Sequence, residues 1–354
     1  MYIGGFQLPD KNAAAQRVLA NAKALQAIGY NVIFINALTD CEEITPTWIM
    51  YEDFQCYEYK RENQLKYLVS ISFIKAIIEQ KKVDCVIAYN YPAIALERLR
   101  RYCVRNKVRC IGDVSEWYVP VGNVFYKLIK YFDTEFRMKY VHPRLDAVIA
   151  ISEYLYVYYK EKVHTVQIPP LVDLEEDKWK AKKDSNTKQV KLIYAGSPSA
   201  QKEKLDVIVR QVSQMSKQQD IELKIVGITK DEFQEIYGIT CEEKNIVFLG
   251  RQSNREVIRL VTESDFSIIY REDNKVVKAG FPTKVVESIS AGTPVIANKF
   301  SNITDYLNRR NSIVITEIDN LENINLVAEK KKKNVERYLF DYHSYLDWFK
   351  ELMK

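Results

Sequence analysis

The chain has 354 residues, of which 47% are hydrophobic and 28% are charged. This is the composition of a folded globular protein, and it excludes a disordered, collagenous or coiled-coil chain. The 52 lysine and arginine residues exceed the 47 aspartate and glutamate residues by only five, so we expect no nucleic-acid partner. At about 150 residues per domain, the length favours two domains.

Three sequence features favour a cytoplasmic location. The six cysteines lack the paired short spacings of a zinc ribbon or a disulfide framework, which favours reduced thiols. The first residues, Met1 to Gly5, lack the basic and apolar regions of a signal peptide. No apolar run approaches the ~18 residues of a membrane span.

From the start to about residue 170, short β-branched runs alternate with longer helical stretches, as in repeated βα units. We therefore expect a mostly parallel sheet. Strands are predicted at 32–35, 83–89, 108–111, 146–150 and 163–168, with helices beginning near Ala13, Asn63, Pro92 and Val121.

A second series of the same kind follows Pro169-Pro170 and the charged stretch 175–189, which is typical of an interdomain linker. Its strands are predicted at 190–194, 223–226, 246–249, 266–270, 294–297 and 312–315. The fold class is therefore α/β, with two doubly wound domains, 1–170 and 171–335, facing a central cleft. The aromatic-rich segment 336–354 should form a helix that packs across the domain junction. Ligands of such domains bind at the carboxyl ends of the strands.

The segment 278–297 is the most informative part of the chain. Here a glycine loop enters a helix through Pro282, whose fixed φ suits a first turn. The free N–H groups near Thr283 and Lys284 then form an anion site. Glu287 lies one turn further in, where its carboxylate can accept hydrogen bonds from the vicinal hydroxyls of a ribose.

This segment resembles the donor-site signature of the retaining glycosyltransferases of family 4, which have the GT-B fold and transfer sugars from nucleotide diphosphates. The resemblance spans nearly the whole chain. Supporting segments are the Gly4-Gly5 loop, Ile111-Gly112-Asp113, Ala150-Ile151-Ser152, Ile168 to Asp173, Tyr194 to Pro198 and Leu249-Gly250-Arg251. The resemblance implies that the first domain binds the acceptor and the second the nucleotide sugar. The implied donor-binding residues are Gly4, Gly5, Gly196, Ser197, Lys202, Gly250, Arg251, Lys278, Gly280, Phe281, Pro282, Thr283, Lys284 and Glu287.

The sequence departs from this family pattern at two places. Glu287 matches the second glutamate of the family's paired-glutamate motif, but Ala279 stands at the position of the first. Ser197 occupies the place of an arginine that grips the diphosphate. Lys202 is the candidate for the accompanying lysine, with Lys204 as a competitor and a solvated lysine at a helix start as the alternative interpretation of either.

The resemblance implies front-face transfer, in which the departing phosphate oxygen helps to deprotonate the acceptor hydroxyl and no side-chain nucleophile is needed. Lys202 would stabilise the departing charge. Asp113 and Glu116 flank a strand end and could orient or deprotonate the acceptor. A helix N-cap and a solvated carboxylate are the alternatives for these two. No histidine pairs with carboxylates or cysteines at metal-ligand spacing, so we expect metal-independent transfer without a cofactor.

The predicted helix 122–141 is unusually apolar, and Lys127, Lys130 and Arg137 share one stripe at helical spacing. Such a helix could lie on an anionic membrane and give access to a lipid-linked acceptor. A core helix with one solvated basic face explains the pattern equally well.

Together these features predict a retaining glycosyltransferase of a surface-polysaccharide pathway, cytoplasmic or peripheral on the inner face of the membrane. We favour a UDP-sugar over a GDP-sugar as the donor, and a glycan or a lipid-linked molecule as the acceptor. A nucleotide-sugar epimerase of the same fold and a catalytically silent partner of another transferase are the two alternatives.

Overall fold

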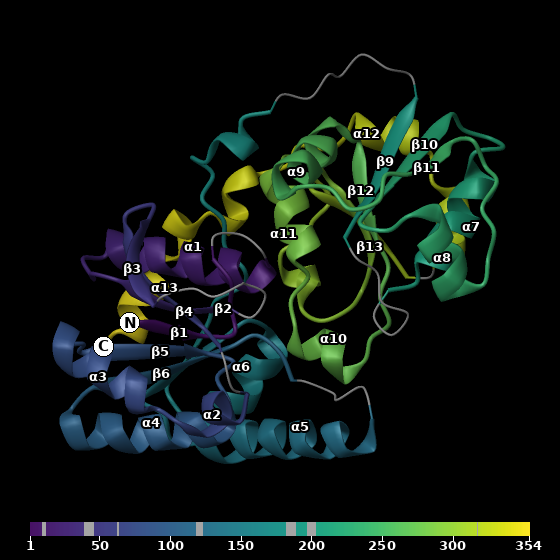
Figure 1. Ribbon diagram of the computed structural model, residues 1–354. Coiled ribbons are helices and arrows are strands. Elements are labelled where there is room, and N and C mark those ends of the chain that lie inside the picture. The colour runs from purple at the N-terminus through teal and green to yellow at the C-terminus, as the bar shows by residue number, and fades with distance from the viewer. Residues whose placement is uncertain are drawn as a thin grey trace. The chain divides into compact units, whose positions relative to one another are not determined.

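The structure, a computed structural model, describes residues 1–8, 12–38, 46–61, 64–117, 123–181, 189–196, 203–316 and 318–354. The chain divides into two compact units (Figure 1). Unit 1 comprises Met1–Leu171 and Tyr345–Lys354, and unit 2 comprises Val172–Ser344. Both are α/β units built on a parallel sheet, as predicted.

The described residues of unit 1 form an eight-stranded sheet in the order β3-β4-β2-β1-β5-β6-β7-β8. Its pairings are parallel except for that between β3 and β4. The strands are β1 (Tyr2–Gly4), β2 (Ile33–Leu38), β3 (Thr47–Tyr51), β4 (Phe54–Lys60), β5 (Cys85–Tyr89), β6 (Arg109–Val114), β7 (Ala147–Ala150) and β8 (Thr165–Gln167).

Helices cover both faces of this sheet, with α1 and α13 on one face and α4 and α5 on the other (Figure 1). The side chain of Asn12 caps α1 by accepting a hydrogen bond from the N–H of Ala15, as N-cap residues commonly do. The helices of unit 1 are α1 (Ala13–Ala27), α2 (Gln64–Val69), α3 (Ser72–Lys81), α4 (Ala93–Asn106), α5 (Val124–Phe136), α6 (Glu153–Tyr159) and α13 (Leu346–Leu352).

The hairpin of β3 and β4 was not predicted from the sequence. None of the five side chains of β3 is fully buried, so this strand shows no clear alternation of apolar and polar residues. The turn between the strands contains Glu52 at φ 48° rather than a glycine, so it carries no obvious turn signal. β4 pairs in parallel with β2 and extends the sheet.

The described residues of unit 2 form a six-stranded, wholly parallel sheet in the order β11-β10-β9-β12-β13-β14. Its strands are β9 (Val190–Ala195), β10 (Ile221–Val226), β11 (Ile246–Phe248), β12 (Phe266–Ile269), β13 (Val295–Asn298) and β14 (Ser312–Ile315), close to the six predicted runs. Its helices are α7 (Leu205–Met215), α8 (Lys230–Tyr237), α9 (Asn254–Glu263), α10 (Lys275–Ala279), α11 (Thr283–Ser290) and α12 (Leu326–Lys330).

The charged stretch 175–189 is not wholly a linker, which corrects the prediction for its described part. A short 3₁₀ turn spans Asp177–Trp179, and the buried Trp179 packs against Ile193 and Ile258 in the core of unit 2. A single tryptophan has no period, so the sequence pattern did not reveal it. Residues 182–188 lie outside the described part.

The C-terminal segment begins in unit 2 and ends in unit 1. Its last helix, α13, contacts α1 and β8, and Arg109 donates hydrogen bonds to the carbonyls of Leu352 and Met353. The predicted packing across a domain junction stays a prediction. Among the described helices, none is both long enough and apolar enough to cross a bilayer.

Candidate functional site

The carboxyl end of β9 in unit 2 meets the first turn of α11. Gly196, which follows β9, has φ +141°, and a Cβ there would lie 2.1 Å from Cε of Lys284. A residue with a side chain would therefore displace the lysine, and its positive φ also favours glycine. The sequence prediction that Gly196 and Lys284 share one site is consistent with this contact.

Lys284 belongs to a buried cluster that we call the Glu203 cluster: Tyr194, Glu203, Arg271 and Lys284. The Lys284 ammonium donates to the Tyr194 hydroxyl at 2.9 Å and to Oε2 of Glu203 at 2.6 Å. Arg271 donates to Oε1 of Glu203 from Nε at 3.1 Å and from Nη2 at 2.6 Å. The Tyr194 hydroxyl also donates to Glu203. Two cations thus share one carboxylate, which leaves one positive charge in excess.

The electrostatics of the cluster follow from its burial. Burial lowers the pKa of Lys284 to about 8, although Glu203 acts in the opposite direction. Burial alone would raise the pKa of Glu203, but Lys284 and Arg271 outweigh that effect and hold the pKa below its usual value. Glu203 therefore stays ionised at neutral pH, and Lys284 is mostly charged there.

Glu287 lies one turn into α11 from Lys284 and is half-buried. Burial raises its pKa to about 7, while Lys284 and Lys178 act in the opposite direction. Among the described residues, no hydrogen bond satisfies its carboxylate. The first intrahelical hydrogen bond runs from the N–H of Val285 to the carbonyl of Pro282, so the N–H groups of Thr283 and Lys284 precede it. A half-buried acceptor and free helix N–H groups thus lie on one helix start.

The other predicted donor-binding residues of unit 2 differ in what they expose. Phe281 is a core residue, with ring contacts to Tyr306 and Phe340, so only its backbone is available to a ligand. Lys278 forms an ion pair with Asp273 at 3.0 Å, and Arg251 has an 82% exposed side chain. Gly280 caps α10, and Gly250 adopts φ +61° after β11.

Of the two departures from the family pattern, Ala279 is described by the structure and Ser197 is not. Ala279 is wholly buried at the end of α10, so its side chain offers no polar contact. Ser197 and Lys202 lie outside the described residues. The competitor Lys204 forms an ion pair with Glu272 at 2.7 Å, which occupies its ammonium.

In unit 1, the predicted glycine loop follows β1. Gly4 adopts φ +149°, and a Cβ there would lie 2.2 Å from the carbonyl oxygen of Tyr89. Only glycine permits this close approach of β1 and β5. A Cβ at Gly5 would meet nothing within 4 Å, so this position has open space around it.

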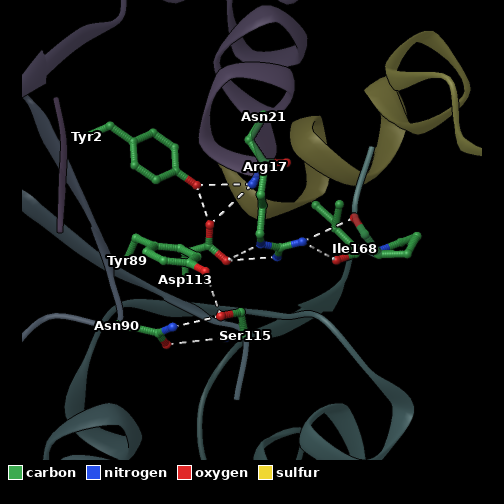
Figure 2. Close-up of polar contacts among 9 residues, drawn as sticks. Tyr2, Arg17, Asn21, Tyr89, Asn90, Asp113, Ser115 and Ile168 are labelled. Carbon is green, nitrogen blue, oxygen red and sulfur yellow. Dashed lines mark hydrogen bonds and ion pairs between the residues drawn. The ribbon is translucent and has the colours of Figure 1, made fainter. Parts of the chain in front are cut away.

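Asp113, at the end of β6, is wholly buried in what we call the Asp113 network: Tyr2, Arg17, Asn21 and Asp113 (Figure 2). Arg17 donates to Oδ1 at 3.0 and 2.8 Å, and the Tyr2 hydroxyl donates to Oδ2 at 2.5 Å. Arg17 also donates to the carbonyls of Ile168 and Pro169. Neither an N-cap nor a solvated carboxylate describes Asp113, so both alternative interpretations are wrong for it. Its predicted contact with an acceptor stays a prediction, as does that of the half-buried Glu116.

The predicted basic helix is shorter than expected, because α5 passes into a π-helical turn at Arg137–Val141. Its apolar side chains are largely exposed, including Val124 at 74% and Phe132 at 66%, so the core-helix interpretation is wrong. Lys127 is exposed and Lys130 half-buried. Arg137 is not surface-facing: it is buried and donates to the carbonyls of Asn90 and Tyr91 at 3.0 and 3.3 Å.

The residues that the sequence analysis missed are Glu203, Arg271, Tyr194 and Arg17. A usable signal existed for Arg271, which follows the buried strand β12 and therefore stands at the carboxyl edge of the sheet. No local signal marked Glu203, which lies between two lysines. Among the described residues, no group of three His, Cys, Asp or Glu side chains is placed to hold a metal ion.

Comparisons with known proteins bear on the family and on the fold. The sequence model of the family described as Glycosyl transferases group 1 matches residues 175–336, which lie within unit 2 and contain Gly196, Lys284 and Glu287. This part of the chain is therefore similar in sequence to group 1 glycosyltransferases. A search of curated proteins found no match.

Solved structures resemble the chain over its full length. Sucrose-phosphate synthase from Thermosynechococcus elongatus has a TM-score of 0.69 at 16% identity, covering 99% of this chain and 97% of that one. HepE from Anabaena in complex with UDP-glucose has a TM-score of 0.65 at 14% identity, covering 99% and 98%. The α,α-trehalose 6-phosphate synthase from Burkholderia multivorans has a TM-score of 0.61 at 10% identity, covering 99% and 97%. These likenesses establish the fold: the chain has the GT-B fold, as predicted.

Proposed function

We propose that this protein is a retaining glycosyltransferase that moves a sugar from a nucleotide diphosphate to a glycan or lipid-linked acceptor in polysaccharide biosynthesis. The observation that carries the proposal is the Glu203 cluster, which holds an excess positive charge beside Gly196 and the first turn of α11. It lies within the region similar to group 1 glycosyltransferases. A buried excess cation calls for an anionic ligand, and a nucleotide diphosphate supplies one.

We assign the parts of the donor to residues of unit 2. The diphosphate binds Lys284 and the N–H groups at the start of α11, where the helix dipole also favours an anion. Glu287 accepts hydrogen bonds from the ribose hydroxyls, since its carboxylate has no partner among the described residues. HepE, a neighbour in fold, has been solved with UDP-glucose, which supports UDP over GDP as the carrier.

The transfer step needs charge stabilisation more than a nucleophile. The acceptor oxygen bonds to the anomeric carbon on the face from which the phosphate oxygen departs, and the acceptor proton passes to that oxygen. Negative charge grows on the diphosphate, so a preorganised ammonium stabilises the transition state more than the bound donor. Lys284 and Lys202 supply this charge, and the reaction is metal-independent.

The acceptor side belongs to unit 1. The exposed apolar residues of α5, together with Lys127 and Lys130, suit an anionic membrane surface, where a lipid-linked acceptor would be found. This supports a peripheral association with the membrane, without Arg137.

A catalytically silent partner of another transferase is the second candidate. Ala279 favours it, because this buried methyl group replaces the carboxylate that the family resemblance places against the donor sugar. A silent protein would bind the nucleotide without hydrolysing or transferring the sugar.

The test combines binding with turnover. UDP, GDP, UDP-glucose and GDP-mannose are titrated into the full chain in a thermal-shift assay, since a ligand of the folded state raises Tm by mass action. UDP release is then measured with and without a polyprenyl phosphate acceptor. Acceptor-dependent UDP release supports the transferase, and UDP binding without any release supports the silent partner. Absence of any nucleotide-dependent shift would contradict both.

A further inference from the structure

A second candidate site lies wholly within unit 1, apart from the Asp113 network. It is a cavity of about 430 Å³ at the end of β4, bounded by α2, by the start of α3 and by Tyr91 after β5. We call it the basic cavity, because Lys60, Arg61 and Lys66 all line it. Its volume lies in the range of small-molecule sites, roughly 300–1,000 Å³. It stands at the carboxyl edge of the sheet, where ligands of doubly wound domains bind.

Aromatic rings form the apolar part of the basic cavity. The rings of Tyr67 and Tyr91 meet edge to face with centroids 5.6 Å apart. The ring centroids of Tyr59 and Phe73 are 5.1 Å apart. Burial raises the pKa of Tyr59, of Tyr67 and of Tyr91, so their hydroxyls stay protonated and able to donate. Rings with hydroxyl donors suit a saccharide, whose C–H faces are apolar and whose hydroxyls accept and donate hydrogen bonds.

Two of the three cations that line the cavity, Lys60 and Arg61, are short of partners. The guanidinium carbon of Arg61 lies 3.9 Å from the centroid of the Tyr67 ring, and the buried Nε of Arg61 has no hydrogen-bond partner. Among the described residues, neither Lys60 nor Arg61 forms an ion pair, and no acidic side chain lines the cavity. An unsatisfied guanidinium donor, in a cavity that Lys60 also lines, is suited to a phosphate, which Arg binds in bidentate fashion.

We propose that the basic cavity binds the phosphorylated saccharide portion of the acceptor, with the phosphate on Arg61 and Lys60 and the sugar ring against Tyr67 and Tyr91. The proposal rests on the proposed function, of which it names the acceptor class. Neither Arg61 nor Tyr67 was among the residues assigned to acceptor binding by sequence.

The surroundings of the cavity leave two sources for such a group. Arg137, just past the end of α5, donates to the carbonyl of Tyr91 at 3.3 Å, so the exposed apolar helix is anchored to a residue of the cavity. A phosphorylated head group on a lipid could therefore reach the cavity while α5 contacts the membrane. A free sugar phosphate carries the same chemistry without the lipid.

The first arm of the test uses soluble probes. Glucose 6-phosphate, glucose and inorganic phosphate are titrated into the full chain by calorimetry. We expect glucose 6-phosphate to bind most tightly, and Arg61→Gln to weaken it by about tenfold or more, since a charge-assisted pair is lost. Arg61→Lys should restore part of the affinity. Arg105→Gln, which removes an exposed cation from α4 outside the cavity, is the matched control and should bind as the wild type does.

The second arm uses vesicles of phosphatidylcholine with and without phosphatidylinositol 4-phosphate, in a flotation assay. Binding to the doped vesicles that Arg61→Gln abolishes, without binding of glucose 6-phosphate, would assign a lipid source. Binding of glucose 6-phosphate that Arg61→Gln weakens would assign a soluble one. Circular dichroism and Tm establish that each variant is folded.

The proposal is overturned if neither probe binds, or if Arg61→Gln and Arg105→Gln bind alike. A shift of Tm with UDP in the same samples separates this failure from that of the proposed function. If UDP binds but neither glucose 6-phosphate nor the doped vesicles bind, the donor site is supported and only the acceptor assignment is wrong.

Discussion

Two buried ionic clusters, one in each unit, stand at the carboxyl edge of a parallel sheet and differ in charge balance. In the Asp113 network one carboxylate meets one guanidinium, and the two side chains are 0% and 2% exposed. In the Glu203 cluster one carboxylate meets Lys284 and Arg271, which keep 11% and 15% of their side chains exposed. The first cluster is neutral and closed, whereas the second is positive and partly open.

This difference separates a structural role from a binding role. A buried pair whose charges cancel has no need of a further partner, and removal of either member leaves the other as an uncompensated charge. A cluster with one excess cation gains by binding an anion from solution. Equal burial and equal hydrogen-bonding therefore do not imply equal function, and the following experiments test the distinction.

The largest expected effect is on stability in unit 1. Asp113→Ala leaves the Arg17 guanidinium buried without its carboxylate, so the free energy of unfolding should fall by about 3–5 kcal/mol in urea denaturation. Glu263→Ala removes one of the two carboxylates that pair with Arg259 on an exposed helix face and should cost less than about 1 kcal/mol. Equal losses of unfolding free energy in the two variants would show that the Asp113 network contributes no more to stability than an exposed ion pair does.

The second largest effect is expected on turnover, through a substitution in unit 2. Lys202→Ala is expected to lower kcat by about 10²-fold while leaving Tm nearly unchanged, because the positive charge matters most as the diphosphate departs. Lys204→Ala is the control, since its ammonium is paired with Glu272. A larger loss of kcat for Lys204→Ala would assign the diphosphate to the other lysine.

Nucleotide binding should depend on pH in two opposite ways. Glu287, with its pKa raised to about 7, gains its charge as the pH rises through 7, so UDP-glucose should bind more tightly. Lys284, with its pKa lowered to about 8, loses its charge above pH 8, so binding should weaken again. Calorimetry across this range should therefore show an affinity maximum between the two values.

Glu287→Gln should flatten the rising limb and weaken binding at pH 7.5 by about 1–3 kcal/mol, since an amide replaces a charged acceptor. The matched control is Glu242→Gln, which changes an exposed carboxylate elsewhere in unit 2. A rising limb that persists in Glu287→Gln would remove Glu287 from the ribose site.

A smaller effect is expected on membrane association, which should involve only unit 1. The double variant Lys127→Gln and Lys130→Gln should lose about 1 kcal/mol per residue in binding to anionic vesicles, as measured by sedimentation at low and high salt. The control, Lys244→Gln with Lys331→Gln, removes two exposed lysines from unit 2. Equal loss in both would indicate a diffuse charge effect rather than a surface on α5.

The smallest expected effect is that of chelation. If Lys202, Lys284 and the start of α11 supply the positive charge for the diphosphate, sugar transfer should persist in excess EDTA. Complete loss of transfer, restored by magnesium or manganese, would contradict this arrangement.

The sequence predicted unit 2 more completely than unit 1. Strands buried on both faces are continuous apolar runs, and all six runs of unit 2 became strands. In unit 1, β3 and β4 were missed because none of the five side chains of β3 and only two of the seven in β4 are fully buried. β4 nevertheless supplies Lys60 at the edge of the basic cavity. The apolar pattern of a strand reflects the burial of its side chains, so it is a weaker signal where the strand is half exposed.

Sequence alone determined the two series of alternating strands and helices, the glycine at the end of β9, and the helix start that carries Lys284 and Glu287, because each depends on a local run of residues. Only the tertiary structure decided which charges meet. Glu203 binds Lys284, which is 81 residues away in the sequence, and Arg271, which is 68 residues away. Arg137 was predicted to lie on a surface stripe, but it donates hydrogen bonds to backbone carbonyls inside unit 1. Such pairings depend on how distant segments pack, and no spacing along the chain encodes that geometry.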